Sequence, residues 1–324
     1  QVYEDGADFE GSIPYHRLVT ELFLYSSILG KKNLSPFSSV FQKRLKKMIL
    51  FIRQYTKPDG YCPVVGDNDN GRVLTTGIEA SNDHRYLLNI AAAHLNDSHF
   101  IDTCERTYED ALMIFGEKAQ SVFNEKKPSE TRSRHFKSSG YIVLRNQNNY
   151  LFIESSKMGL ADRGGHGHND FGSFELSLVG EPIIVDSGCY SYTFDYLERN
   201  NFRSTSYHNT PVLDSEEINR FISPFHLWGL KHDARNLEHY LEENGDVDTA
   251  IISHDGYRRL KAGLVLKRVF QLSKKEPKAV IIERISNLEG ISDIKIPFHF
   301  HHGVSARIED NKVLITTKSN CFQL

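Results

Sequence analysis

Apolar residues in the first third of the chain recur every three or four positions, the spacing of one face of an α-helix. The clearest run starts at Pro14, a residue suited to a first helical turn, and stops at Gly30, a residue suited to a helix end. Similar runs extend from about Pro36 to just before Pro58, from Asn82 to Leu95 and from His99 to Phe115. The pattern therefore predicts four amphipathic helices, packed in pairs, within residues 1–124.

The period changes after a polar stretch. Residues 125–133 show no apolar period and are predicted to be a linker. Beyond them, short runs alternate with period two and are separated by Gly, Asn, Asp and Pro. The predicted strands are Tyr141–Arg145, Tyr150–Glu154, Ser173–Val179, Pro182–Asp186, Asn209–Leu213, Thr249–His254, Leu264–Leu272, Ala279–Ile285, Ile294–Phe300 and Lys312–Thr316. With no convincing helix among them, residues 134–324 are predicted to form an antiparallel β-sandwich.

The composition is that of an ordinary globular protein. The 324 residues include 39 Lys and Arg against 42 Asp and Glu, and this net charge of −3 argues against a nucleic-acid-binding surface. No apolar run approaches the roughly 18–20 residues of a membrane span. The four cysteines form no CxxC pair and are expected to pack as small apolar side chains. Because the chain starts at Gln1 without a signal-peptide pattern and stops within a strand-like run, we expect a fragment at both ends.

The 15 histidines are unusual, and two of them lie in the densest polar motif of the chain. The loop 163–170, RGGHGHND, presents His166 and His168 two residues apart, among three glycines that permit positive φ. Asp186 ends an apolar strand, where an unpaired carboxylate would be costly, and His208 follows later. Two imidazoles and a carboxylate suit zinc, while a histidine-rich surface loop without metal is the alternative.

Strand geometry limits this metal hypothesis. A two-residue turn at Gly180-Glu181 would place Asp186 opposite Glu175, and an extended chain would carry His168 about 23 Å further away. The glycine-rich loop must therefore fold back if His168 and Asp186 are to share a metal.

Several segments resemble the signature of the heparinase II/III family. In the β-rich half they are residues 164–177 (GGHGHNDFGSFELS), 182–192 (PIIVDSGCYSY) and 199–210 (RNNFRSTSYHNT). In the helical half they are residues 5–12 (DGADFEGS) with 15–17 (YHR), and 59–63 (DGYCP) with 66–69 (GDND). The order and spacing of these segments make the resemblance specific.

The resemblance implies part of an (α/α) toroid followed by an antiparallel β-sandwich, an α+β multidomain arrangement. It implies a polysaccharide lyase that cleaves a uronic-acid-containing glycan by β-elimination. It also implies a structural zinc in the β-domain, bound by His168, Asp186 and His208. Tyr61, in a Pro-Asp-Gly-Tyr turn, would be the acid/base and His166 would assist it. A turn tyrosine that only packs on its neighbours is the alternative for Tyr61.

One departure from the family concerns the group that neutralises the substrate carboxylate. This residue is usually Asn or His in the family, and Asp8 stands at the matching position. An ionised Asp8 about 4 Å from a carboxylate would cost ~4 kcal/mol at an effective dielectric of ~20. Asp8 would therefore have to be protonated, be paired with Arg17 or Arg203, or have another role.

Further residues are predicted to bind the substrate. Arg199 and Arg203 suit carboxylates and sulfates, Tyr190 and Tyr192 could stack on sugar rings or fill the sandwich, and His16 could edge the cleft. Such a local cleft would let a nearly neutral chain hold an acidic polysaccharide.

The sequence allows other interpretations of the function and of two motifs. The main alternative to the lyase is a catalytically idle acidic-glycan-binding or exopolysaccharide-assembly protein of the same fold. A zinc hydrolase is disfavoured because no general-base carboxylate adjoins the histidine pair. The segment Gly66–Gly71 is interpreted as a turn in preference to a calcium loop, and His299 with His301 as strand residues in preference to a metal site. The substrate class alone suggests a periplasmic or extracellular location.

Overall fold

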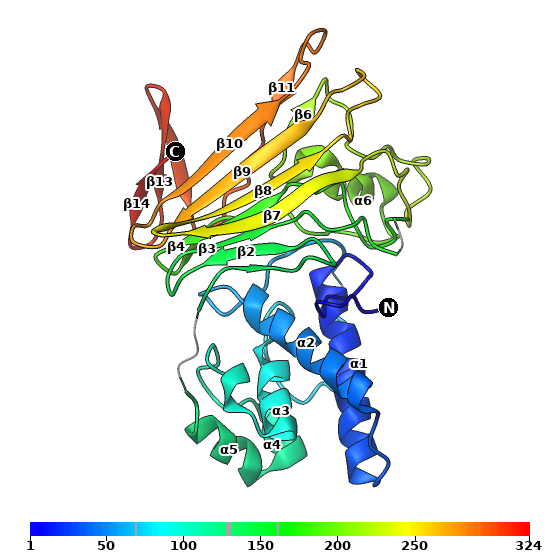
Figure 1. Cartoon of the computed structure of the whole chain (residues 1–324), viewed down its shortest axis with the longest axis vertical. Coiled ribbons are helices and arrows are strands. Elements are labelled where there is room, and N and C mark those ends of the chain that lie inside the picture. The colour runs from blue at the N-terminus through cyan, green and yellow to red at the C-terminus, as the bar shows by residue number, and fades with distance from the viewer. Residues whose placement is uncertain (69, 128–130, 161) are drawn as a thin grey trace.

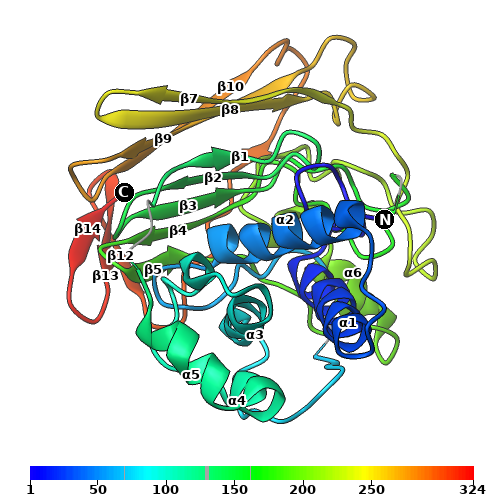
Figure 2. The ribbon, with the colours of Figure 1, turned by 60° about the horizontal axis from the view of Figure 1, so that its bottom comes forward.

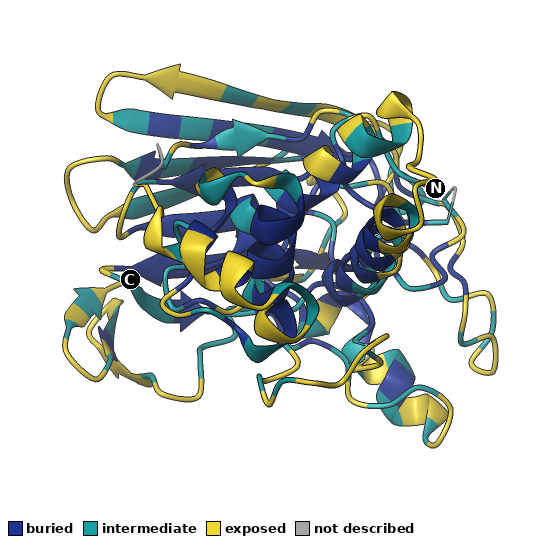
Figure 3. Cartoon of the chain, turned by 90° about the horizontal axis from the view of Figure 1, so that it is seen from below, coloured by how far each residue is buried: buried dark blue, intermediate teal, exposed yellow. Residues whose placement is uncertain are grey.

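The computed structural model describes residues 1–68, 70–127, 131–160 and 162–324. Its elements form layers, with helices on one face of a five-stranded sheet and a four-stranded sheet on the other face (Figures 1 and 2). The burial colouring shows the inner helix faces and the central strands buried, while the outer helix faces are exposed (Figure 3).

The helices of the first 124 residues are α1 (Ile13–Lys32), α2 (Ser39–Tyr55), α3 (Arg85–Leu95), α4 (Glu109–Phe115) and α5 (Glu117–Asn124), with a 3-10 turn η1 at Ser98–Phe100. The hydroxyls of Ser12 and Ser38 cap α1 and α2 by accepting from the N–H three residues on. The first three predicted helices are confirmed. The fourth is wrong over its first half, where the chain forms η1 and a loop whose Asp102 carboxylate pairs with Arg53 of α2. Helix α5 was not predicted.

The five-stranded sheet has the order β1-β2-β3-β4-β5, all antiparallel. Its strands are β1 (Arg134–His135), β2 (Ile142–Arg145), β3 (Tyr150–Ile153), β4 (Phe174–Leu178) and β5 (Glu181–Ile184). Alternate residues of β3 enter different cores: Tyr150 and Phe152 pack with the helices, whereas Leu151 and Ile153 pack between the sheets. This sheet is therefore buried on both faces.

The four-stranded sheet has the order β10-β9-β8-β7. Its strands are β7 (Asn236–Asn244), β8 (Val247–His254), β9 (Leu266–Ser273) and β10 (Ala279–Ile285). Smaller sheets are β6 (Val212–Leu213) with β11 (Ile294–Lys295), and β12 (Ser305–Glu309) with β13 (Lys312–Thr316) and β14 (Cys321–Gln323). The antiparallel sandwich is confirmed. Strand β7 was missed because its sequence, NLEHYLEEN, is mostly exposed and polar.

Two local expectations were wrong. A short helix, α6 (Tyr196–Phe202), lies in the β-rich part, and the Asp195 carboxylate caps it through two backbone N–H groups. The β4–β5 turn is Val179-Gly180, both with positive φ, and a register shift follows in β5. As a result Asp186 does not lie opposite Glu175.

The helical and β-rich halves share one apolar core. Tyr55 of α2 packs in the same cluster as Tyr141 and Phe152 from the β-rich half, and the Tyr150 hydroxyl donates to the Tyr55 carbonyl. The described helices do not show the closed ring of an (α/α) toroid, so the toroid stays a prediction. The division at residues 125–133 stays a prediction, and residues 128–130 of that segment lie outside the described residues.

The cysteines differ in environment. Cys62 and Cys104 are buried in the shared core, as expected, whereas Cys189 is half-buried and Cys321 exposed, and all four are free. None of the helices in the described ranges is long and apolar enough to cross a membrane.

Candidate functional site

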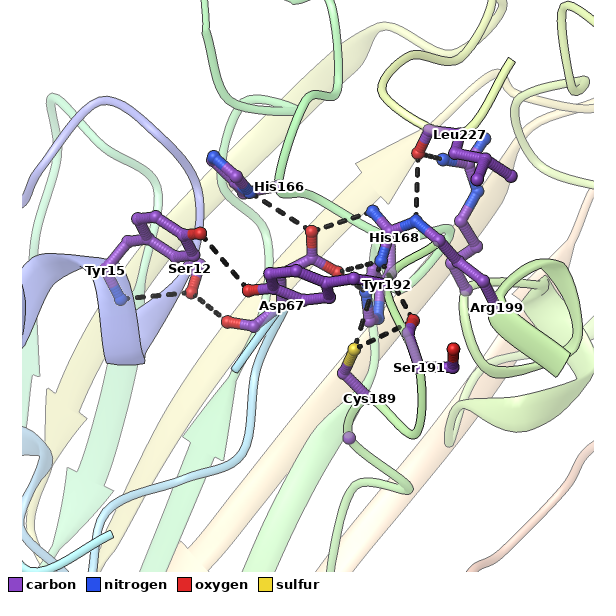
Figure 4. Close-up of polar contacts among 12 residues, drawn as sticks. Ser12, Tyr15, Asp67, His166, His168, Cys189, Ser191, Tyr192, Arg199 and Leu227 are labelled. Carbon is purple, nitrogen blue, oxygen red and sulfur yellow. Dashed lines mark hydrogen bonds and ion pairs between the residues drawn. The ribbon is translucent and has the colours of Figure 1, made fainter. Parts of the chain in front are cut away.

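Asp67, from the segment between α2 and α3, lies where the helices meet the β-rich half. Its fully buried carboxylate contacts three side chains (Figure 4): His166 Nδ1 at 3.1 Å, His168 Nε2 at 3.0 Å, and both terminal nitrogens of Arg199 at 2.8 Å. Burial alone would raise the pKa of Asp67, but hydrogen bonds from these three partners hold it well below its usual range. Asp67 is therefore a carboxylate shared by two imidazoles and a guanidinium.

Backbone contacts fix the loop that carries the two histidines. The Asp67 N–H donates to the His166 carbonyl at 2.9 Å. A Cβ on Gly66, which has φ +73°, would meet that carbonyl at 2.7 Å, and a Cβ on Gly167 would meet the Met158 carbonyl at 2.6 Å. The glycines thus permit the close approach by which the loop folds back, as the sequence required.

A half-buried aromatic group adjoins Asp67. The Tyr15 ring, in the first turn of α1, stacks on His166 with ring centroids 3.8 Å apart, and its hydroxyl lies 3.2 Å from the Tyr192 hydroxyl. Trp228 meets the same imidazole edge-on at 5.7 Å. We call Tyr15, Asp67, His166 and Tyr192 the junction cluster, because its members come from both halves of the chain.

Helix α6 and its C-cap residue supply two arginines whose side chains are buried. Arg199 is 2% exposed, binds Asp67, donates to the Leu227 carbonyl and lies 4.2 Å from the Trp228 ring centroid. Arg203 is fully buried and donates to the carbonyls of His226, Leu227 and Gly229. The structure therefore places these two predicted substrate ligands beneath the surface, where they anchor the loop 226–229.

A second group of polar side chains lies deeper in the β-rich half. His168, Asp170 and His208 are buried, and one potential ligand atom of each lies within 4.8 Å of the others. Among the described residues, His168 Nδ1, Asp170 Oδ2 and His208 Nε2 have no hydrogen-bond partner. We call these three residues the metal cluster. Unpartnered buried polar atoms are costly, and this donor set suits a divalent cation.

Asp186 lies behind the metal cluster. Its Oδ2 atom accepts from His208 Nδ1 at 2.8 Å, and the Asp186 Oδ1 atom accepts from the Gly188 N–H. This pairing leaves His208 Nε2 for the cluster, the arrangement by which a carboxylate orients a metal-binding imidazole. A cavity of about 230 Å³ is lined by His168 and Asp170.

Other predicted site residues belong to neither cluster. Tyr61 is 40% exposed and outside the junction cluster. His16 is buried, its pKa is lowered to about 4 by burial, and its ring nitrogens contact the Asp8 N–H and the Met48 carbonyl. Burial raises the pKa of Asp8 to about 7, and its carboxyl accepts from the Glu10 N–H. Tyr190 is exposed and stacks on Phe202.

Three residues of these clusters were missed as site residues in the sequence. The sequence predicts Asp67 as part of a turn, while Tyr15 and Asp170 stand in segments that resemble the family without a role of their own. The signal that could identify them is their position in these segments, next to predicted site residues.

Comparison with known proteins identifies the relationship. The family model described as "Heparinase II/III-like, C-terminal" matches residues 128–324, more than half of the chain. This chain belongs to the heparinase II/III family. A curated heparin-sulfate lyase from Bacteroides stercoris is 24% identical over 268 residues, which cover 81% of this chain and 34% of that protein. The chain thus spans about a third of the length of this relative.

Solved structures share the fold. A heparan sulfate lyase from Pedobacter heparinus is 20% identical with a TM-score of 0.72, covering 98% of this chain and 44% of that one. A heparinase III structure is also 20% identical with a TM-score of 0.71, covering 97% and 44%. The likeness extends over both the helical and the β-rich halves.

Proposed function

We propose that the chain is part of a polysaccharide lyase that cleaves a uronic-acid-containing glycan by β-elimination. Membership of the heparinase II/III family supports the reaction class, and relatives named as heparin or heparan sulfate lyases support an acidic polysaccharide substrate. The observation that carries the proposal is the Tyr15–His166 stack, which puts a phenol and an imidazole together where the two halves meet.

The chemistry requires a group that neutralises the substrate carboxylate and two proton transfers. A base removes the proton at C5 of the uronate, the C–H electrons form the C4–C5 double bond, the C4–O4 bond breaks, and an acid protonates O4. Phenol and imidazole groups can perform both transfers when they are held against the reacting atoms. No water is added, so the new end of the product is an unsaturated uronate.

Tyr15 is the phenol best placed for this role. It is half-buried, contacts His166 and lies 3.2 Å from a second hydroxyl, that of Tyr192. Tyr61, the candidate given by the family resemblance, is exposed in a turn outside the junction cluster. We therefore assign the acid/base role to Tyr15, with His166 assisting, and retain Tyr61 as the competing candidate.

The metal cluster fits zinc, with His168 Nδ1, His208 Nε2 and Asp170 as ligands and Asp186 orienting His208. A bound zinc would supply positive charge between buried carboxylates and would fix the loop that carries His166. Asp186 as a direct ligand, the assignment from the family resemblance, is the competing arrangement.

The test is a survey of uronate glycans. The purified chain is incubated with heparan sulfate, heparin, alginate, hyaluronan and bacterial exopolysaccharides, and the unsaturated product is followed by ultraviolet absorbance and mass. We expect Tyr15→Phe to lower the rate by about 10²–10⁴-fold, because the ring stack is kept while the proton is lost. Tyr61→Phe is the matched control and should change the rate less than threefold.

Other outcomes point elsewhere. Loss of activity in Tyr61→Phe with retention in Tyr15→Phe would reverse the assignment. A hydrated product end would indicate a hydrolase, and glycan binding without turnover would favour the idle binding protein. An acidic polysaccharide substrate is the basis for proposing a periplasmic or extracellular location.

A further inference from the structure

We propose that Asp67 is a positioning residue that holds His166 and His168 in opposite tautomers, one suited to proton transfer and the other to metal binding. The part that concerns proton transfer rests on the proposed function. The part that concerns the metal cluster does not depend on catalysis.

The tautomers follow from the contacts of one carboxylate. An ionised carboxylate only accepts hydrogen bonds, so each ring nitrogen that faces it must carry a proton. Asp67 Oδ2 faces His166 Nδ1, and Asp67 Oδ1 faces His168 Nε2. His166 therefore carries its proton on Nδ1 and His168 on Nε2.

Each ring is left with one nitrogen turned away from Asp67. For His168 this atom is Nδ1, which is buried and has no partner among the described residues, and His168 itself belongs to the metal cluster. For His166 it is Nε2, on a ring that is 18% exposed and stacked on Tyr15, with Glu10 Oε2 at 3.5 Å. One atom can bind a cation and the other can exchange a proton with a bound molecule.

Arg199 keeps Asp67 ionised and oriented. Its two terminal nitrogens grip the two carboxylate oxygens at 2.8 Å, and the guanidinium is itself held by the Leu227 carbonyl and the Trp228 face. The carboxylate plane is thereby fixed, so that each oxygen faces a different imidazole.

The backbone of Asp67 ties the same residue to Tyr15. The Ser12 hydroxyl donates to the Asp67 carbonyl at 2.6 Å and accepts from the Tyr15 N–H, while the Asp67 N–H binds the His166 carbonyl. One residue of the helical half thus sets the position of the phenol, the imidazole and a metal ligand. If Asp67 served only to orient a metal ligand, its contact with His168 would be enough.

The first test reads the tautomers in the unmodified chain. Long-range proton–nitrogen NMR on histidine-labelled, zinc-loaded protein should show His166 protonated on Nδ1 and His168 protonated on Nε2, with zinc bound at Nδ1. His166→Gln and His168→Gln spectra assign the signals. A His166 ring protonated only on Nε2, or zinc bound at His168 Nε2, would overturn the proposal.

The second test replaces the carboxylate. Asp67→Asn offers one acceptor and one donor, so one imidazole must change its tautomer. We expect zinc affinity, measured by chelator competition, to fall 10–100-fold, and the tautomer of at least one histidine to change. Asp246→Asn, which changes an exposed carboxylate outside both clusters, is the control and should preserve both tautomers and the zinc affinity. Unchanged tautomers and affinity in Asp67→Asn would contradict the proposal even if no glycan is cleaved.

The catalytic part has its own readout. If a glycan from the survey is cleaved, Asp67→Asn should lower kcat at least tenfold while KM stays within threefold, because the substrate does not contact the buried carboxylate. A change in KM with kcat unchanged would contradict a positioning role. If no glycan of the survey is cleaved, the proposed activity is contradicted, but the result on the histidine tautomers is unaffected.

Discussion

The β-rich half and the junction between helices and sheet both bury polar groups, but in opposite ways. In the β-rich half, His168, Asp170 and His208 of the metal cluster each have an atom without a hydrogen-bond partner among the described residues. At the junction, Asp67 has all its partners within the protein, and a buried ion pair joins Lys57 to Glu175 at 3.0 Å. The difference teaches that unpartnered buried atoms gathered at one place favour a bound ligand, whereas fully paired ones hold two parts of the chain together.

The largest effect should come from emptying the metal cluster. His208→Ala and Asp170→Asn each remove a proposed ligand, so both should abolish stoichiometric zinc by elemental analysis. Zinc at 1,000 times its Kd should stabilise the wild type by about 4 kcal/mol, and this gain should vanish in both variants.

Asp186→Asn tests whether Asp186 binds the metal directly or only orients His208. If Asp186 only orients His208, this variant should keep one zinc per chain with affinity reduced about 10–100-fold. Complete loss of zinc from Asp186→Asn, together with retention in Asp170→Asn, would restore Asp186 as the direct ligand.

Breaking the junction ion pair should have the next largest effect. Lys57→Met leaves the buried Glu175 carboxylate with the Val64 N–H as the remaining partner of its side chain among the described residues, so the free energy of unfolding should fall by about 3–5 kcal/mol in denaturant titrations. Zinc content should not change. The exposed pair Lys275–Asp246 is the matched control, and Asp246→Asn should cost less than about 1 kcal/mol.

A double variant separates the charge from the packing. Lys57→Met with Glu175→Gln removes both charges, and part of the lost stability should return. If Lys57→Met alone has no effect, the pair does not hold the two halves together.

The smallest effect concerns pH. Burial, with the nearby Glu10 charge, raises the pKa of Asp8 to about 7, above its ordinary value of 3.8. The folded state then binds this proton more tightly than the unfolded state, so its contribution is full below about pH 4 and is lost as pH rises through about 7.

Asp8→Asn tests this directly. The variant should lack the decline in stability between pH 4 and 7 that Asp8 causes, with a difference on the order of 1–3 kcal/mol in the pH profile of unfolding. Parallel profiles for wild type and Asp8→Asn would show that folding does not raise the pKa of Asp8.

Much of the fold could be predicted from periodicity. The helices α1 and α2 and the strands β8, β9 and β10 could be predicted because one face of each is apolar, and β2 and β3 because each is a short, nearly continuous apolar run. Strand β7 and helix α6 were not found, because β7 is polar along its length and α6 has only seven residues. A short or exposed element leaves too weak a pattern to detect.

The site was only partly predictable. The loop with His166 and His168, together with His208, stood out by composition and by resemblance. The role of Arg203 as an anchor of the loop 226–229 could not be predicted. An arginine that binds backbone carbonyls looks the same in the sequence as one that binds a substrate.

The sequence by itself determined the family, the order of helical and β-rich halves, and the histidines on which the site depends. Only the tertiary structure decided their partners. It brought Tyr15, rather than Tyr61, against His166, gave the two imidazoles one carboxylate from Asp67, and set Asp170 beside His168 and His208. The physical reason is that hydrogen bonds and stacking act over a few ångströms between residues far apart in the chain, and periodicity records only which side of an element is buried.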